Sequence, residues 1–243
     1  MAPSRHPMVV LTGAGISVES GIPTFRGLDG IWQGHDPQLL ATPQAFQRDP
    51  ELVWRFYEWR RGLVAEGKPN AAHRQLYEIE QALPDFTLIT QNVDGYHQAA
   101  GNLDVLELHG SLWVIKCTGC SHRWENHRIP LDILPPVCPV CGALARPDIV
   151  WFGENLQAEV LHSAILKAKQ AKIFLTIGTS SIVYPAAELP LIAQQHGAYL
   201  VEINPEETPI SPHMDEVRRG SASVELLDWW ENSYGKLELL DSE

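Results

Sequence analysis

The chain has 243 residues, of which 44% are hydrophobic, 20% charged and 8% aromatic. This is an ordinary globular composition, which excludes a disordered tail protein, a collagen-like fibre and a coiled coil. The net charge is −12 with histidine neutral. Broad nucleic-acid binding requires a basic surface, so we expect no direct nucleic-acid partner. A chain of this length buries enough surface to fold without disulfides, as one large domain or one with a small insert.

Short apolar runs alternate with helical patterns along the chain. The predicted strands, rich in Val, Ile, Leu and Phe, are Met8–Thr12, Phe86–Thr90, Val105–Leu108, Ile173–Ile177 and Tyr199–Ile203. The predicted helices are Glu51–Glu66, Ala71–Leu83, Ala158–Lys169 and Pro185–Gln195. Strands without strict polar–apolar alternation, separated by helices, are typical of a parallel sheet covered on both faces. The pattern predicts an α/β fold with a Rossmann-like doubly wound parallel sheet and a ligand crevice at the carboxyl ends of its strands.

Two segments interrupt the alternation of strands and helices. Residues from about 31 to 83 are mostly helical, and residues from about 112 to 145 contain all four cysteines. We interpret both as insertions that form a smaller lobe, from a helical insert and a cysteine-rich ribbon. The larger lobe then comprises about 1–30, 84–111 and 146–243, within a single domain over 1–243.

The cysteines occur as two Cys-x-x-Cys pairs with 17 residues between them. They are Cys117, Cys120, Cys138 and Cys141. No run of about 18 apolar residues predicts a membrane span, and the N-terminal residues lack the features of a signal peptide. We therefore expect a cytoplasmic protein without a membrane partner. In that reducing compartment the spacing favours a tetrahedral Zn²⁺ site over disulfides, with a redox pair as the alternative.

Polar and glycine residues follow the ends of all five predicted strands. These segments are Gly13–Gly15, Thr90–Asp94, Glu107–Gly110, Gly178–Ser180 and Glu202–Glu206. A glycine-rich turn after a first strand allows the backbone to approach a phosphate, although a plain tight turn explains one such segment equally well. Any single segment could also be a helix cap. Five of them at one predicted sheet edge indicate a ligand site.

These blocks together resemble the sirtuin family of NAD⁺-dependent protein lysine deacylases. GAGISVESGIPTFRG, TQNVDG, LELHG, the cysteine pairs, RPDIVWFGE, GTSSIVYPAAELP and EINPEET stand in the family's order from about residue 8 to residue 226. The departures from the family pattern, Val18, Tyr96 and Gly142–Ala145, remove no polar group. The resemblance implies that NAD⁺ is consumed, that an acylated lysine in a protein or peptide is the substrate, and that the cysteines hold one structural Zn²⁺. Free lysine, nicotinamide and O-acyl-ADP-ribose are the implied products.

The resemblance also assigns roles to individual residues. His109 matches the catalytic base, which suits an imidazole that titrates near neutral pH. Asn92 and Asp94 match residues that hold the nicotinamide end, while Phe25 would shield the reactive ribose carbon and Arg26 would face phosphate. The positions matching the family's cofactor-binding residues are Gly13, Ala14, Gly15, Ile16, Glu19, Thr24, Phe25, Arg26, Trp32, Gln91, Asn92, Val93, Asp94, Gly178, Thr179, Ser180, Asn204, Pro205, Glu206 and Ala222.

The implied substrate site has a peptide part and an acyl part. The positions matching the peptide-binding strand are Val150, Trp151, Phe152, Gly153 and Glu154. Tyr57 and Arg60, three residues apart on one predicted helix face, match the subclass that removes succinyl and malonyl groups. There Tyr and Arg bind the distal carboxylate, and Ala41 matches a small residue that leaves room. Without the resemblance, Tyr57 is a core-edge aromatic and Arg60 a solvated charge.

Four other functions are alternatives to an acidic-acyl deacylase. A predominant deacetylase and a mono-ADP-ribosyltransferase use the same scaffold, and a sensor would bind without turnover. A Rossmann dehydrogenase lacks support, because Val18 stands where a third glycine of the dinucleotide fingerprint would fall. We predict a monomer that prefers succinyl-lysine and retains deacetylase activity.

Overall fold

The computed structural model describes residues 7–25, 30–34 and 36–234, except for the side chains of Trp32, Gln33 and Ser233. A six-stranded sheet with the order β3-β2-β1-β7-β8-β9 forms its centre, and every neighbouring pair is parallel. The strands are β1 (Met8–Thr12), β2 (Phe86–Thr90), β3 (Val105–Glu107), β7 (Ile173–Ile177), β8 (Tyr199–Ile203) and β9 (Glu216–Arg218). The predicted strands are confirmed. β9 was not predicted, because two of its three residues are charged.

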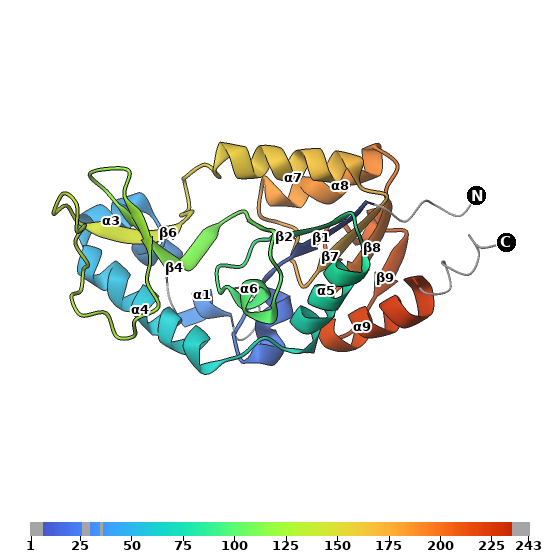
Figure 1. The fold of residues 1–243 in the computed structure, drawn as a ribbon, viewed down its shortest axis with the longest axis horizontal. Coiled ribbons are helices and arrows are strands. Elements are labelled where there is room, and N and C mark those ends of the chain that lie inside the picture. The colour runs from blue at the N-terminus through green and yellow to red at the C-terminus, as the bar shows by residue number, and fades with distance from the viewer. Residues whose placement is uncertain (1–6, 26–29, 35, 235–243) are drawn as a thin grey trace.

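Helices cover both faces of the parallel sheet (Figure 1). Val10 of β1 packs in one cluster with residues of α5 (Ala71–Ala82) and α9 (Ala222–Asp228). Its neighbour Val9 packs in another cluster, with α7 (Ala158–Gln170) and α8 (Leu189–Gln195). Because successive side chains of a strand point to opposite faces, this alternation buries the sheet on both sides. The predicted doubly wound architecture is confirmed.

The carboxyl ends of the parallel strands meet at one edge. After β1 the chain enters a 3₁₀ helix, η1 (Ala14–Ser20), and α6 (Tyr96–Ala100) follows the segment after β2. The remaining short helices are η2 (Ala186–Glu188), η3 (Ser211–His213) and the π-helical η4 (Trp229–Tyr234). Strand order reverses between β1 and β7, and this is where ligands bind in open α/β sheets.

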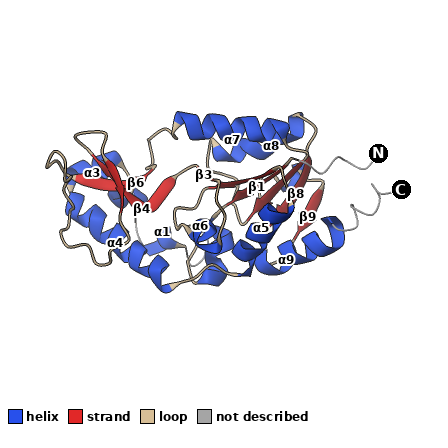
Figure 2. Ribbon diagram, viewed as in Figure 1, coloured by secondary structure: helices blue, strands red, loops and turns tan. Residues whose placement is uncertain are grey.

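The smaller lobe combines four helices with a separate three-stranded antiparallel sheet (Figure 2). Its elements are α1 (Ile31–Gly34), α2 (Pro37–Leu40), α3 (Pro43–Arg48), α4 (Pro50–Glu66), β4 (Gly110–Cys117), β5 (Arg123–Glu125) and β6 (Ala145–Ile149). Asp36, Thr42 and Asp49 each cap a helix that begins with proline, a favourable start because proline lacks the N–H that would be unpaired there. The antiparallel sheet was not predicted.

One hydrophobic cluster joins the helical insert to the cysteine-rich insert. Trp54 and Phe56 of α4 share it with Ile115 of β4 and Ala145 of β6, and the Trp54 indole donates to the Ala145 carbonyl at 2.7 Å. This shared core supports the two-lobe division that we propose. In the described part of the chain, every helix is too short or too polar to span a bilayer.

Candidate active site

The loops after β1 and β7 lie in direct contact at the switch point of the parallel sheet. The Gly15 N–H donates to the Gly178 carbonyl at 2.8 Å. A Cβ on Gly13 or Gly15 would lie within 2.8 Å of atoms of Gly178 or Thr179, and Gly178 has a φ of 61°. These positions therefore require glycine, because any side chain would push the two loops apart. The predicted cofactor segments Gly13–Ile16 and Gly178–Ser180 are brought together here.

A hydrogen-bond network connects the β1 loop to the segment after β2. The Asn92 amide donates to the Gly13 carbonyl at 3.1 Å and to Ser17 Oγ at 3.3 Å. Ser17 Oγ donates to Asp94 Oδ2 at 2.8 Å, and the Tyr96 N–H donates to Asp94 Oδ1 at 3.0 Å. Burial raises the pKa of Asp94, and these hydrogen bonds and the nearby Arg60 oppose that rise. Ser17 was missed in the sequence, although it lies directly after Ile16 in the same motif.

His109 lines a cavity of about 620 Å³ together with Phe25, Gln91 and Val93. Its Nδ1 lies 2.9 Å from the Gln91 carbonyl oxygen, which accepts only if Nδ1 carries the hydrogen. Burial lowers the pKa of His109, so the ring is neutral at physiological pH and its Nε2 has a lone pair. The ring is therefore neutral, with its hydrogen on Nδ1 and a lone pair on Nε2, which is the state that a general base requires.

A smaller recess adjoins this cavity and shares Phe25, Arg60 and Val93 with it. Asn92 and Asp94 also line the recess, with Ala14 and Ser17. The three residues predicted to be catalytic thus line two connected spaces, His109 the larger and Asn92 and Asp94 the smaller. Ile22 and Pro23, which also line the recess, were not predicted.

Tyr57 and Arg60 lie at the cavity wall, with Ala41 nearby. Tyr57 Oη accepts from the Trp151 indole at 2.8 Å, which leaves the phenolic hydrogen to donate. The Arg60 guanidinium lies 4.7 Å from the centre of the Phe25 ring. Arg60 is only 5% exposed, so the solvated-charge interpretation is wrong, and burial lowers its pKa. Among the described residues no carboxylate forms an ion pair with Arg60.

The segment 150–154 lines the same cavity but forms a turn after β6 and not a strand. The N–H groups of Val150 and Phe152 donate to the carbonyls of His109 and Ala41, at 3.0 and 2.9 Å. Glu154 is held by a two-pronged bond from Arg146, at 2.6 and 2.9 Å, and accepts from the Trp151 N–H at 2.9 Å. These bonds engage the N–H groups of Val150, Trp151 and Phe152 and fix the turn.

The predicted cofactor residues Asn204, Pro205 and Glu206 follow β8, which carries the buried carboxylate of Glu202. Glu202 accepts from Thr208, Ser211 and Arg219, the last at 2.7 Å. The Asn204 amide donates to the Glu206 carbonyl at 2.9 Å, and this bond spans Pro205.

The remaining predicted cofactor residues have different outcomes. Glu19 accepts from the Ser223 N–H at 3.1 Å, next to Ala222 at the start of α9, so its carboxylate ties η1 to that helix. The Thr24 carbonyl accepts from the Ile31 N–H at 2.9 Å. Arg26 and the side chain of Trp32 lie outside the described residues.

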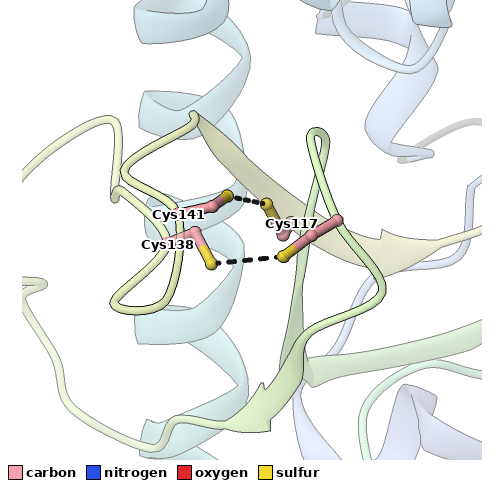
Figure 3. Close-up of side chains that lie close together, drawn as sticks. Cys117, Cys138 and Cys141 are labelled. Atoms are coloured by element: carbon pink, nitrogen blue, oxygen red, sulfur yellow. Dashed lines mark hydrogen bonds between the residues drawn. The ribbon is translucent and has the colours of Figure 1, made fainter.

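The four cysteines form one compact cluster in the smaller lobe (Figure 3). Sγ atoms of Cys117 and Cys141 lie 3.4 Å apart, those of Cys120 and Cys138 3.8 Å apart, and no disulfide links them. All four sulfurs lie within 4.8 Å of one another. Tetrahedral Zn²⁺ with bonds of about 2.3 Å places sulfurs about 3.8 Å apart, so the cluster fits zinc. Four thiolates fill the coordination shell, as in a structural site.

Comparisons with known proteins agree with this geometry. The model of the Sir2 family matches residues 13–185. An NAD-dependent protein deacylase of Aquifex aeolicus is 49% identical over 94% of this chain and 97% of its own. A mutant Sir2 homologue in complex with ADP-ribose superposes with a TM-score of 0.93 at 44% identity, covering 98% of this chain and 96% of that one.

A Sir2 mutant with a deacetylated p53 peptide and 3′-O-acetyl ADP-ribose has a TM-score of 0.80 at 33% identity, covering 94% of both chains. The chain therefore belongs to the Sir2 family, whose members are also called sirtuins. The resemblance of the sequence motifs to that family is confirmed.

Proposed function

We propose that this protein is an NAD⁺-dependent protein lysine deacylase that prefers succinyl- and malonyl-lysine and retains deacetylase activity. One observation carries the proposal: a neutral, oriented His109 and a buried Arg60, which forms no ion pair among the described residues, line the same cavity of about 620 Å³. The relative in Aquifex aeolicus is named for the deacylase reaction, which supports the general activity. The acyl preference rests on Tyr57 and Arg60 alone.

The residues at the switch point fit NAD⁺. The β1 and β7 loops approach closely enough to require glycine, and the adjoining recess is lined by the carboxamide of Asn92 and the carboxylate of Asp94. These two groups would hold the nicotinamide amide and a ribose hydroxyl. Phe25, at the junction of recess and cavity, would exclude water. When bound, NAD⁺ supplies the ribose carbon that loses nicotinamide and so accepts the acyl oxygen.

His109 would act as the general base in this reaction. The Gln91 carbonyl keeps the hydrogen on Nδ1, so the lone pair of Nε2 would be available to accept the proton of a ribose hydroxyl. Gln91 is itself fixed, because its amide donates to Thr179 Oγ1 at 2.8 Å. The β2 and β7 loops therefore set the orientation of the base together.

Tyr57 and Arg60 would bind the carboxylate at the end of the acyl chain. A guanidinium accepts a carboxylate in a two-pronged geometry, and the free phenolic hydrogen of Tyr57 adds a neutral donor. Burial favours this pairing, because the attraction between opposite charges is stronger away from water. An acetyl group leaves the guanidinium without its partner, so deacetylation proceeds without this gain.

Zinc would be held by Cys117, Cys120, Cys138 and Cys141, and it would stabilise the smaller lobe without entering the reaction. Acylated proteins or peptides are the proposed partners, and the cytoplasm and a monomeric state stay predictions. A mono-ADP-ribosyltransferase would have no use for a carboxylate-binding arginine, so Arg60 favours the deacylase over that alternative.

Paired peptides test the proposed function directly. One peptide carries succinyl-lysine and the other acetyl-lysine, and each is incubated with and without NAD⁺ while mass spectrometry follows peptide and O-acyl-ADP-ribose. We expect NAD⁺-dependent loss of succinyl well ahead of acetyl. Faster removal of acetyl would overturn the acyl preference, and turnover of neither peptide would overturn the deacylase assignment.

A further inference from the structure

The indole of Trp113 connects the three-stranded sheet β5-β4-β6, which carries Cys117, to the backbone of the segment after β2 that carries Asn92 and Asp94. Trp113 Nε1 donates to the Asp94 carbonyl oxygen at 2.6 Å. One residue earlier on β4, the Leu112 N–H donates to the Val93 carbonyl at 2.9 Å. We propose that Trp113 is a positioning residue for NAD⁺ and nicotinamide binding, through which the cysteine-bearing sheet fixes the Asp94 carboxylate. This inference rests on the proposed role of Asp94 in the site.

The contact is close enough to fix the conformation of the segment. Gly95 has a φ of 78°, and a Cβ on it would lie 3.0 Å from Trp113 Cδ1 and 3.1 Å from Nε1. The indole therefore packs directly against the backbone that follows Asp94. The position of the Tyr96 N–H determines where the Asp94 side chain is held, since this group donates to Asp94 Oδ1.

The indole is itself held by two charged or polar groups of the smaller lobe. The Arg61 guanidinium from α4 lies 5.3 Å from the ring centre, and the His127 ring stacks on it at 5.1 Å with an interplanar angle of 18°. Arg61 also donates to the Asn126 carbonyl at 2.6 Å. The strand that carries Trp113, β4, ends at Cys117 of the cysteine cluster. It therefore runs directly from that cluster to the segment after β2 that carries Asp94.

The neighbouring strand provides a matched control. Trp124 on β5 is also half-buried and also stacks on a histidine, His122, at 5.2 Å. Among the described residues, its indole has no hydrogen bond to the segment after β2. Replacing either tryptophan by phenylalanine removes the N–H and keeps an aromatic ring, so the two variants differ in the bond to Asp94.

The experiment compares Trp113→Phe with Trp124→Phe in the zinc-loaded full chain. Steady-state kinetics gives kcat/KM for NAD⁺, the KM for the acyl peptide and the inhibition constant for nicotinamide. For Trp113→Phe we expect kcat/KM for NAD⁺ to fall about fivefold, and nicotinamide inhibition to weaken by a similar factor, as expected for one lost hydrogen bond. The peptide KM and the zinc content should stay at wild-type values. Trp124→Phe should change none of these quantities by more than twofold.

A second readout does not depend on turnover. In a ¹⁵N–¹H spectrum, the indole resonance that Trp113→Phe removes should shift when NAD⁺ is added, and the one that Trp124→Phe removes should not. Equal kinetic behaviour of the two variants would overturn the proposal, as would parallel losses for NAD⁺ and peptide with a lowered melting temperature. An inactive wild-type protein whose Trp113 resonance still responds to NAD⁺ would contradict the deacylase function and leave this inference intact.

Discussion

The two lobes contribute to the site in different ways. The parallel sheet of the larger lobe contributes loops whose places are set by backbone contacts, as where Gly15 and Gly178 meet at 2.8 Å. The smaller lobe contributes Ala41, which follows α2, and Tyr57 and Arg60 of α4, a helix whose position depends on a core shared with the cysteine-bearing sheet. We expect the cofactor chemistry to depend mainly on residues of the larger lobe, with Trp113 as a support from the smaller one, and the proposed choice of acyl group to depend on the smaller lobe. The predictions below test that division.

Removal of zinc should have the largest effect, because it removes the support of the smaller lobe. The four thiolates would repel one another without a cation, and structural zinc contributes directly to folding. We expect a strong chelator to abolish both desuccinylation and deacetylation, and added Zn²⁺ to restore them. Metal analysis and circular dichroism would be followed in parallel with activity. Full activity in a metal-free sample would contradict a structural zinc site.

His109→Ala should affect both acyl substrates equally. Loss of a general base costs about 10²- to 10⁴-fold in rate, whichever acyl group is transferred. Initial rates with succinyl and acetyl peptides at saturating NAD⁺ measure this change. A variant that lost only one activity would contradict the assignment of the base to the shared chemistry.

The pH profile tests the state of the same residue. Burial lowers the pKa of His109 below its ordinary value of about 6.5, so the ring stays neutral, and active, to lower pH than a free histidine. Activity should therefore be constant through neutral pH and fall about tenfold per pH unit only below the lowered pKa. An acid limb centred above pH 6.5 would exclude His109 as the titrating base.

Arg60→Met should separate the two activities. We expect desuccinylation to fall about 10- to 100-fold through the loss of a charge-assisted bond, while deacetylation stays within about threefold of wild type. Arg55→Met is the matched control, because Arg55 lies on the same helix with an exposed side chain paired to Glu51. Equal losses of both activities in Arg60→Met would return Arg60 to a structural role.

The sequence predicted the larger lobe better than the smaller one, for a physical reason. Strands such as Ile173–Ile177 are buried on both faces and so consist almost entirely of apolar residues. β6 reads Ala-Arg-Pro-Asp-Ile, which no strand pattern would select, although all five residues are buried. Arg146 and Asp148 are tolerated there because Arg146 pairs with Glu154 and Asp148 with Lys116.

In the candidate site, too, some residues were predicted from the sequence and others were missed. The motif residues Asn92, Asp94 and His109 were predicted and do line the connected spaces. Ser17 and Trp113 were missed, because their partners are a side chain 77 residues away and a backbone carbonyl 19 residues away. Contacts across such separations depend on the fold and leave no local pattern in the sequence.

Tyr57→Phe should give the smallest change. The variant loses one neutral donor to the acyl carboxylate, and a hydrogen bond of about 1 kcal/mol corresponds to about fivefold in desuccinylation. The phenol also accepts from the Trp151 indole, so phenylalanine leaves that buried N–H without its partner and should lower the melting temperature. Deacetylation measured well below the melting transition should be unchanged. If both activities fell alike, Tyr57 would serve only to hold Trp151, and selectivity in the smaller lobe would rest on Arg60 alone.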